Sequence, residues 1–193
     1  NEKKNIITFV GKLNKAKGYD VFGEAIINIL NKYKKWKAVV IGDEEREKHY
    51  FKHKNLNLLG FKTHNEVLQI FKKTSISVVC SRWEEPFGRT SLEASSCGCA
   101  VIITNRGGLP ETITNGIIVE KLSKKNIFEA IENLIKNKNF RVKLQKLSIK
   151  NFNLTNRHSS KLIDEYRNEL INKKIPIQKR KIKILHVTNF NER

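Results

Sequence analysis

Short apolar runs alternate along the chain with segments in which apolar residues recur every three or four positions. The runs predict six buried strands, at residues 6–10, 38–41, 56–59, 76–80, 100–104 and 116–119. The helical spacing predicts helices near residues 19–30, 66–72, 90–97 and 123–135. Continuous apolar strands separated by helices are typical of a parallel sheet covered on both faces. We therefore predict an α/β fold with a doubly wound parallel sheet.

Helical patterns continue after the sheet, over residues 138–151 and 155–172. We therefore expect C-terminal helices and place the domain at residues 4–172. Residues 173–193 have the composition of a basic linker and contain a strand-like run at Ile184–Thr188. A lone strand cannot complete a strand–helix–strand unit, so this run predicts the first strand of a following, truncated domain. Because the sequence also has no Met, we expect it to be part of a longer protein.

The charge is unevenly distributed. The net charge is +19, and residues 121–193 contribute 19 basic and 6 acidic residues. Such a basic region attracts nucleic acid, anionic lipid or phosphorylated ligands, or it forms only a solvated lysine coat. No motif that reads RNA or DNA accompanies the charge, so we expect no nucleic-acid partner. A lysine coat and contact with an anionic membrane surface stay open.

The cysteine, histidine and hydropathy patterns exclude several classes of site. Cys80, Cys97 and Cys99 have no metal-type spacing, so we expect buried reduced thiols, as in a cytoplasmic protein. The five histidines show no ligand spacing, and we predict neither a metal site nor a catalytic triad. The sequence has no signal peptide and no apolar run near about 18 residues, so it predicts no membrane span.

A glycine- and lysine-rich loop follows the first predicted strand, from Gly11 to Gly18 (GKLNKAKG). Ligands of parallel sheets bind beyond the carboxyl ends of the strands. A glycine turn, a helix N-terminus and lysines together favour an anion site at this position. The segment is not a P-loop, because no Ser or Thr follows the lysine. An ordinary basic strand-to-helix loop stays open as an alternative.

The segment from Glu85 to Glu93 (EPFGRTSLE) leaves the strand at 76–80 and enters a helix. Its two carboxylates are eight positions apart, and free N–H groups at the helix start near Gly88 can bind an oxyanion. A structural alternative is a capping box from Thr90 to Glu93, worth about 1 kcal/mol to the helix. A capping box explains Thr90 and Glu93 but neither Glu85 nor Gly88, and both interpretations stay open here.

Three further loops follow predicted strands. They contain Gly42 and Asp43, Gly60 and Phe61, and the run GGLPE at 107–111. Each alone is a common turn. Because all these loops lie at carboxyl ends of strands, we expect them to converge with the two segments above on one crevice.

With these motifs, the sequence resembles the C-terminal, donor-binding, Rossmann-like half of GT-B fold glycosyltransferases, closest to retaining family 4. The resemblance covers about residues 5–172. Glu85 and Glu93 match the E-x7-E motif of that family, and EPFG matches its usual form. The segment from Gly11 to Gly18 matches the G-R-L…K-G motif, except that Lys12 stands where Arg is usual. Lys keeps the charge but loses the two-pronged fork of Arg.

The resemblance implies a role for each matching residue. Two lysines would hold the diphosphate of a nucleotide sugar and offset charge on the departing nucleotide. Glu85 would hold sugar hydroxyls, Glu93 the ribose hydroxyls, and the amides near Gly88 the phosphate or sugar oxygens. The implied catalytic residues are Lys12, Lys17 and Glu85. The implied donor-binding residues are Gly11, Gly60, Phe61, Phe87, Gly88, Arg89, Thr90 and Glu93, with Gly60 and Phe61 bordering the base.

The resemblance also implies a reaction and partners. The donor would be a UDP- or GDP-linked sugar, with no cofactor and no tightly bound metal. A hexose-type sugar would be transferred with retention to a glycan or lipid-linked acceptor, held by a missing N-terminal half. We expect the chain alone to bind donor but to transfer little sugar. Location would be cytoplasmic, with peripheral contact at the inner face of the membrane left open.

Alternatives on the same fold are a nucleotide-sugar epimerase, a sugar phosphorylase and a non-catalytic scaffold that docks on a membrane. An epimerase would place extra carboxylates and a His in the cleft, and a phosphorylase would need a lysine for pyridoxal phosphate. The sequence does not specify the base, the sugar or the acceptor.

Overall fold

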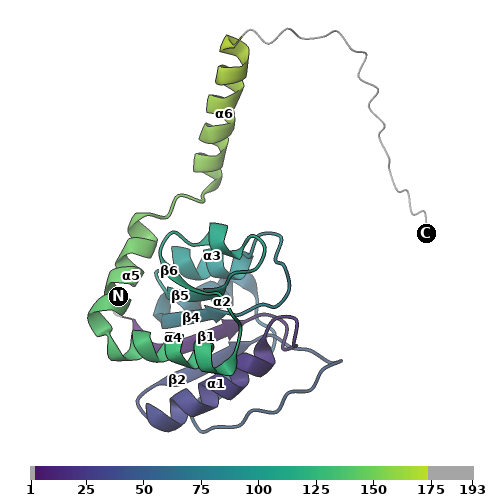
Figure 1. The fold of residues 1–193 in the computed structure, drawn as a ribbon, viewed down its shortest axis with the longest axis vertical. Helices are drawn as coiled ribbons and strands as arrows, with labels where there is room; N and C mark the ends of the chain where they lie inside the picture. Colours follow the sequence, from purple (N-terminus) through teal and green to yellow (C-terminus); the bar gives the residue numbers. More distant parts are fainter. Residues whose placement is uncertain (1–2, 174–193) are drawn as a thin grey trace, which may run out of the picture. The chain divides into compact units, whose positions relative to one another are not determined.

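The structure is a computed structural model and describes residues 3–173. Its centre is a six-stranded parallel sheet in the order β3-β2-β1-β4-β5-β6 (Figure 1). The strands are β1 (Lys4–Val10), β2 (Lys37–Ile41), β3 (Leu56–Leu58), β4 (Thr74–Val79), β5 (Ala100–Thr104) and β6 (Gly116–Val119). The sheet confirms the predicted α/β fold, and each predicted strand is present with ends shifted by at most two residues.

The strand order reverses direction at β1. From β1 the chain adds β2 and then β3 on one side, and it adds β4, β5 and β6 on the other. Ile7 of β1 is in register with Ala38 of β2 and with Ile76 of β4. The loops after β1 and β4 therefore leave the sheet toward opposite faces, which opens a crevice between their carboxyl ends.

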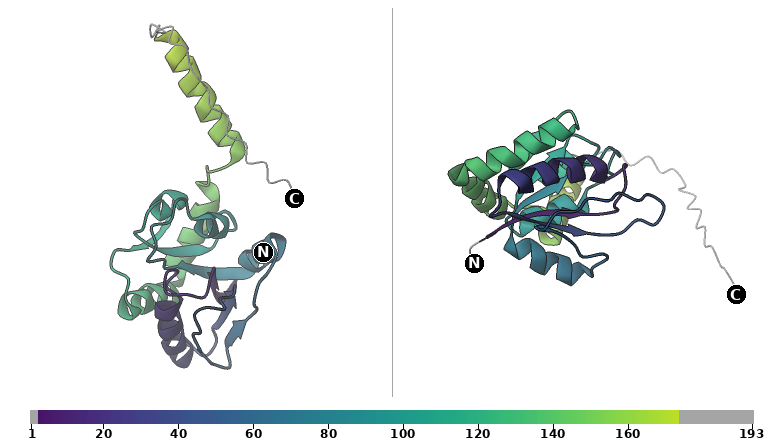
Figure 2. Two further views of the ribbon diagram at one scale, coloured as in Figure 1. Left: turned by 90° about the vertical axis from the view of Figure 1, so that its right-hand side faces the viewer. Right: turned by 90° about the horizontal axis from the view of Figure 1, so that it is seen from below.

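Helices cover both faces of the sheet (Figure 2, right). The helices α1 (Tyr19–Lys32) and α4 (Lys124–Lys136) pack on one face, over a core that includes Phe9, Phe22, Ile76 and Ile131. The helices α2 (His64–Lys73) and α3 (Arg89–Ser96) pack on the other face, over Val39, Phe71, Ala94 and Ile103. Because the strands are buried on both sides, they read as continuous apolar runs in the sequence.

The helix α5 (Lys138–Lys150) is attached to this core through buried polar contacts. The guanidinium of Arg141 donates to the carbonyl oxygens of Leu134 and Ile135 at the end of α4, and it lies 5.1 Å from the ring centre of Trp36. Gln145 Nε2 donates to Ser75 O at 2.9 Å. The bonds from Arg141 satisfy carbonyl groups that the end of α4 would otherwise leave without a partner inside a helix.

The helix α6 (Asn156–Asn172) belongs to a second compact unit, which begins at Thr155. The Thr155 side chain caps the helix by accepting from His158 N, and no residue of α6 is buried. The assignment of residues 155–172 to the domain at 4–172 stays a prediction. The strand predicted at Ile184–Thr188 lies outside the described residues. None of the helices described between residues 3 and 173 combines the length and the apolar character that crossing a membrane requires.

Candidate functional site

A small pocket of about 60 Å³ lies where the strand order reverses. The ends of β1 and β4, the loops that follow them and the start of α3 form its walls. Six of the eleven predicted site residues line it together: Gly11, Lys17, Glu85, Gly88, Arg89 and Thr90. The remaining lining residues are Phe9, Val10, Val79 and Ser81. The structure therefore brings together two segments that are about 70 positions apart in the sequence.

An ion pair between Lys17 Nζ and Glu85 Oε1 lies in this pocket. The Lys17 side chain is 33% exposed and that of Glu85 is 12% exposed, so the carboxylate is the more deeply placed partner. An ammonium group has three N–H donors, and within residues 3–173 Glu85 is the only partner of Lys17 Nζ. The pair can therefore offer further donors and a second carboxylate oxygen to a ligand.

The start of α3 forms another wall of the pocket. Its N-cap is Gly88, in the left-handed conformation with φ of 85°, and no side chain caps the helix. The N–H groups of the first helical turn have no partner inside a helix. Together with the helix dipole they favour a bound anion at this end.

The alternative of a capping box from Thr90 to Glu93 is excluded, because Gly88 is the N-cap of α3 and no side chain caps this helix. Because α3 begins at Arg89, Glu93 is the fifth helical residue and lies two residues beyond the third helical position, from which a box forms. A complete capping box is present at α2 instead, where Thr63 and Glu66 cap each other. Glu93 therefore lies outside the first turn of α3.

Glu93 lies outside the pocket lining, between α2 and α3. Its Oε1 is 3.5 Å from His64 Nδ1 and 3.7 Å from Arg89 Nη2. The Glu93 side chain is 20% exposed. His64 is the first residue of α2. Its place beside Glu93 had no sequence signal, because the rest of α2, the strand β4 and the loop after β4 separate the two residues.

Lys12 does not join Lys17. It is exposed and lines a separate hollow with Asp43, Glu44, Glu45 and Arg46. Hydrogen bonds from Arg46 and Asn14 lower the pKa of the Glu44 carboxyl to about 2. The neighbours of Lys12 are thus mostly carboxylates, and the structure does not bring the two predicted phosphate-binding lysines into one pocket.

The predicted base-side residues Gly60 and Phe61 lie further along the same edge of the sheet. Gly42 N donates to Gly60 O at 2.9 Å, and a Cβ on Gly42 would lie 1.9 Å from Gly11 O. The loops after β1, β2 and β3 therefore adjoin through their backbones. Phe61 is 75% exposed, and Phe87 is 44% exposed; neither lines the pocket.

The loop after β5 holds the Glu84–Phe87 segment in place. Gly108 N donates to Glu85 O at 2.7 Å, and Gly107 N donates to a Glu84 carboxylate oxygen at 2.5 Å. A Cβ on Gly107 would lie 2.3 Å from Glu85 O, so only glycine allows this approach. The two glycines therefore brace the segment that carries Glu85.

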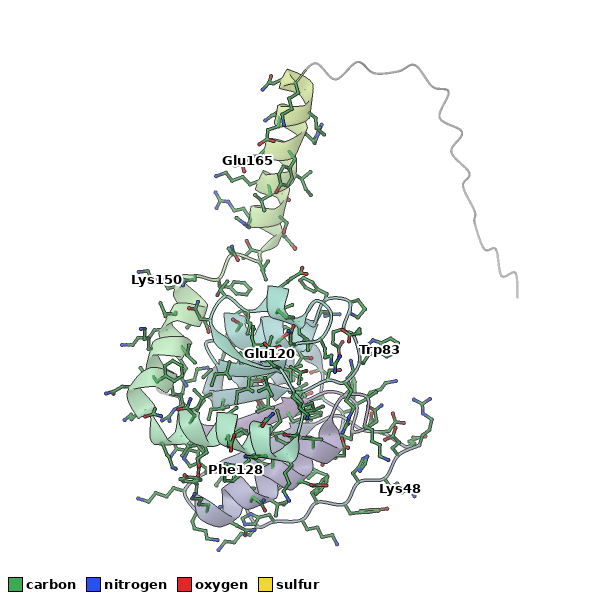
Figure 3. All side chains as sticks on the ribbon, viewed as in Figure 1. Lys48, Trp83, Glu120, Phe128, Lys150 and Glu165 are labelled. Atoms are coloured by element: carbon green, nitrogen blue, oxygen red, sulfur yellow. The ribbon has the colours of Figure 1, made fainter. Side chains whose placement is uncertain are left out.

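A second contact missed from the sequence links the two segments of the pocket. Arg82 forms a two-pronged ion pair with Asp20, at 2.7 and 2.8 Å. The residues are 62 positions apart, and no local pattern connects them. Trp83 follows Arg82 and lies at the surface (Figure 3).

Cysteine and metal chemistry find little support in the described residues. Burial raises the pKa of the Cys80 and Cys99 thiols to about 12, whereas Cys97 is only half-buried. The expectation of buried thiols is therefore confirmed for two of the three. Between residues 3 and 173, no group of three His, Cys, Asp or Glu side chains is arranged to hold a metal ion.

A comparison with family models matches residues 1–151 to the family described as glycosyl transferases group 1. The chain belongs to this family. An uncharacterized glycosyltransferase of Methanocaldococcus jannaschii is 36% identical over 146 residues, which cover 71% of this chain and 40% of that protein. A capsular polysaccharide biosynthesis glycosyltransferase of Staphylococcus aureus is 31% identical over 145 residues, which cover 70% of this chain and 38% of that protein. The chain thus spans less than half the length of these relatives.

Solved structures agree with the family. The C-terminal domain of a glycosyl transferase group 1 family protein from Francisella tularensis is 33% identical, with a TM-score of 0.67. The match covers 75% of this chain and 82% of that domain. An Anabaena protein in complex with UDP and glucose has a TM-score of 0.70 over 89% of this chain and 49% of its own. It is 18% identical, so this likeness shows the fold alone, which matches the C-terminal domains of GT-B glycosyltransferases.

Proposed function

We propose that the pocket binds the diphosphate and sugar of a nucleotide-sugar donor, in the donor half of a retaining glycosyltransferase. The observation that carries this proposal is the Lys17–Glu85 pair beside the uncapped start of α3, in a member of the glycosyl transferases group 1 family. A cation and free amides suit a diphosphate, and a carboxylate that accepts hydrogen bonds suits sugar hydroxyls.

The main chemical effect would be stabilisation of the leaving group. Negative charge grows on the diphosphate as the bond to the sugar breaks. Lys17 and the amides of α3 are held in place before the reaction, so they stabilise this charge without reorganising. In this proposal the lysine and the helix end take the place of a tightly bound metal. The leaving phosphate assists the incoming hydroxyl, which gives retention.

The other residues of the site would divide the donor between them. Glu85 accepts hydrogen bonds from the sugar, and Glu93 accepts them from the ribose. Gly60 and Phe61 border the base, which is uracil or guanine. Lys12 would reach the diphosphate only by moving away from its acidic neighbours. We therefore assign the larger role to Lys17, which already lines the pocket.

The acceptor would bind to residues outside this chain. The chain covers only about 40% of the Methanocaldococcus relative, and the related Staphylococcus protein is named for capsular polysaccharide biosynthesis. We therefore propose transfer of a hexose-type sugar to a glycan or glycolipid acceptor. The 193-residue chain alone should hold donor and show little turnover, and clear transferase activity of this chain would contradict that part of the proposal.

Calorimetric titration with UDP and GDP tests the donor site. One nucleotide should bind, and Lys17→Ala should weaken it about tenfold, a change of about 1.4 kcal/mol. Lys15→Ala is the matched control, because this lysine lies in the same loop, is exposed and does not line the pocket. Equal losses in the two variants would mean attraction by general positive charge, and no binding of either nucleotide to the folded wild type would contradict the proposal.

Contact with an anionic membrane is a second candidate activity, and α5 favours it. This helix has five basic and no acidic residues. Lys143, Lys146 and Lys150 are exposed, and in the described part of the chain no α5 lysine has an ion-pair partner. Each such lysine near an anionic surface contributes about 1 kcal/mol.

Co-sedimentation with phosphatidylserine vesicles tests this contact. Binding should fall steeply with salt and with Lys143→Glu combined with Lys146→Glu, because the attraction is screened within about 10 Å at 0.1 M salt. Binding that survives both changes would point to another surface, and no binding would leave the α5 lysines as a solvated coat.

A further inference from the structure

The segment after β4 holds the loop that carries Lys17. Ala16 O accepts hydrogen bonds from Arg82 N at 2.8 Å and from Trp83 N at 3.1 Å. Ser81 Oγ donates to the same oxygen at 3.1 Å. The residue immediately before Lys17 is therefore fixed by three donors from one short segment.

The Arg82 side chain extends this contact to both sides of Lys17. Its Nη1 donates to Lys15 O at 2.5 Å, and its two terminal nitrogens donate to the Asp20 carboxylate at 2.7 and 2.8 Å. Arg82 therefore contacts the chain on both sides of Lys17, at Lys15 in the loop and at Asp20 in the first turn of α1. The planar fork of Arg matches this arrangement, and Lys cannot reproduce it.

Asp20 is charged in this pair. Partial burial acts to raise the pKa of its carboxyl, but the hydrogen bonds from Arg82 and from Val21 N outweigh this effect, and the pKa is lowered. The loop also approaches β4 closely, because a Cβ on Gly18 would lie 1.9 Å from Cys80 O. Both the ion pair and the glycine therefore hold the loop against the end of β4.

We propose that Arg82 is a positioning residue that acts through Lys17. It locks the loop between β1 and α1, so that Lys17 Nζ stands against Glu85 before a ligand arrives. A group held in place beforehand loses less freedom on binding, which raises affinity and favours the transition state. The inference rests on the proposed function of the pocket, and Asp20 is the partner that keeps the guanidinium in position.

A double-mutant cycle on the 193-residue chain tests this role. The affinity for UDP and GDP is measured for the wild type, Arg82→Ala, Lys17→Ala and the double variant. Arg82→Ala should weaken the nucleotide that binds about tenfold. In the Lys17→Ala background the same change should have less than about a twofold effect, because no ammonium is left to position. Equal losses in both backgrounds would overturn the proposal.

The nucleoside without phosphate separates positioning from general damage. Uridine or guanosine, matched to the nucleotide that binds, is titrated by NMR. Its affinity should be the same within about twofold in the wild type and Arg82→Ala, because Lys17 has no phosphate to contact. An equal loss for nucleoside and nucleotide would overturn the proposal. Glu24→Gln is the control, since Glu24 also forms an ion pair from α1, with Lys124 at 3.7 Å.

Amide hydrogen exchange tests the clamp without any nucleotide. Arg82→Ala should speed exchange at the Lys17 and Gly18 amides by about tenfold or more, and Glu24→Gln should not. Unchanged exchange would overturn the clamp even in a chain that binds nucleotide well. If the wild type binds neither nucleotide, both the proposed function and the positioning role toward a ligand fail. Faster exchange in Arg82→Ala would in that case still show that Arg82 holds the loop.

Discussion

The two helices on one face of the sheet, α2 and α3, begin in opposite ways. At α2, the Thr63 side chain accepts from Glu66 N, and a Glu66 carboxylate oxygen accepts from Thr63 N at 2.9 Å. At α3, the N-cap is Gly88 and no side chain caps the helix. The chain therefore satisfies the donors of α2 itself and leaves those of α3 to the pocket.

This difference shows how the same local pattern serves two purposes. Both helix starts contain a threonine followed three residues later by a glutamate, at Thr63 and at Thr90. The pattern forms a box only at α2. At α3 the left-handed Gly88 is the N-cap, so the helix already begins at Arg89 and Thr90 cannot cap it. The open helix start lines the same pocket as Lys17 and Glu85. An uncapped helix start beside a cation is what an anion site requires.

Gly107→Ala should have the largest effect on stability and nucleotide affinity, because it disturbs the glycine contact that holds the Glu84–Phe87 segment before the open start of α3. Gly107 has φ of 52°, and its new Cβ would lie 2.3 Å from Glu85 O. The backbone strain alone costs about 1–3 kcal/mol, and the displaced Glu85 should also lower nucleotide affinity. Chemical denaturation and calorimetry measure the two effects. Asn105→Ala, in the same loop, is the control, and an unchanged affinity in Gly107→Ala would contradict the brace.

Gly88→Ala should have the next largest effect, because it changes the open end directly. The residue has φ of 85°, and a Cβ would lie 2.6 Å from Leu109 Cδ2. The left-handed conformation costs a non-glycine residue about 1–2 kcal/mol, so both the free energy of unfolding and the nucleotide affinity should fall. Gly98→Ala is the matched control, since Gly98 also has a positive φ, its new Cβ would lie 2.6 Å from Ile149 Cδ1, and it does not line the pocket. An equal loss of nucleotide affinity in the control would mean that the start of α3 has no special role in binding.

Thr63→Ala should destabilise the protein by about 1 kcal/mol, because it removes the capping box of α2. Nucleotide affinity should not change, since Thr63 does not line the pocket. Thermal and chemical unfolding measure the first quantity and calorimetry the second. A loss of affinity in this variant would mean that the two helix ends do not have separate purposes.

Thr90→Ala is the counterpart at α3 and should change the free energy of unfolding by less than about 0.5 kcal/mol. Thr90 makes no capping bond, and it lines the pocket. The same unfolding experiments compare it with Thr63→Ala. A loss of about 1 kcal/mol would restore the capping-box interpretation of Thr90 and Glu93.

The smallest effect is the pH dependence of the α2 cap. Hydrogen bonds from the Thr63 side chain and backbone lower the pKa of the Glu66 carboxyl. A lowered pKa means that this stabilisation is present above the ordinary pKa of a glutamate, about 4.3, and is lost as the pH falls through the lower folded value. The difference in stability between the wild type and Thr63→Ala should therefore shrink below about pH 4. A constant difference between pH 7 and pH 3 would contradict the reciprocal bond.

The fold was predictable because strands buried on both faces leave a strong signal in the sequence. Runs such as AVVI at 38–41 and AVIIT at 100–104 have no polar alternation, which is typical of a parallel sheet covered on both faces. The convergence of Gly11, Lys17 and Glu85 followed from the same topology, because the ends of β1 and β4 are neighbours in any sheet of this order.

The details of the site were not predictable in the same way. The choice between a box and an open start at Thr90 depends on the conformation of Gly88 and on its packing against Leu109. The separation of Lys12 from Lys17 depends on the acidic loop after β2, and the Arg82–Asp20 pair joins residues 62 positions apart. Each is a tertiary contact, and local spacing carries no information about it.

Chemical shift changes of the backbone amides during titration with UDP and GDP test the central claim most directly. If the uncapped start of α3 holds the diphosphate, the largest changes should fall on the amides of Arg89 and Thr90 and near Lys17. The amides of Glu66 and Val67, which bond to Thr63 at the capped start of α2, should move little. Changes centred on α2, or no changes with either nucleotide in a folded chain, would contradict the account.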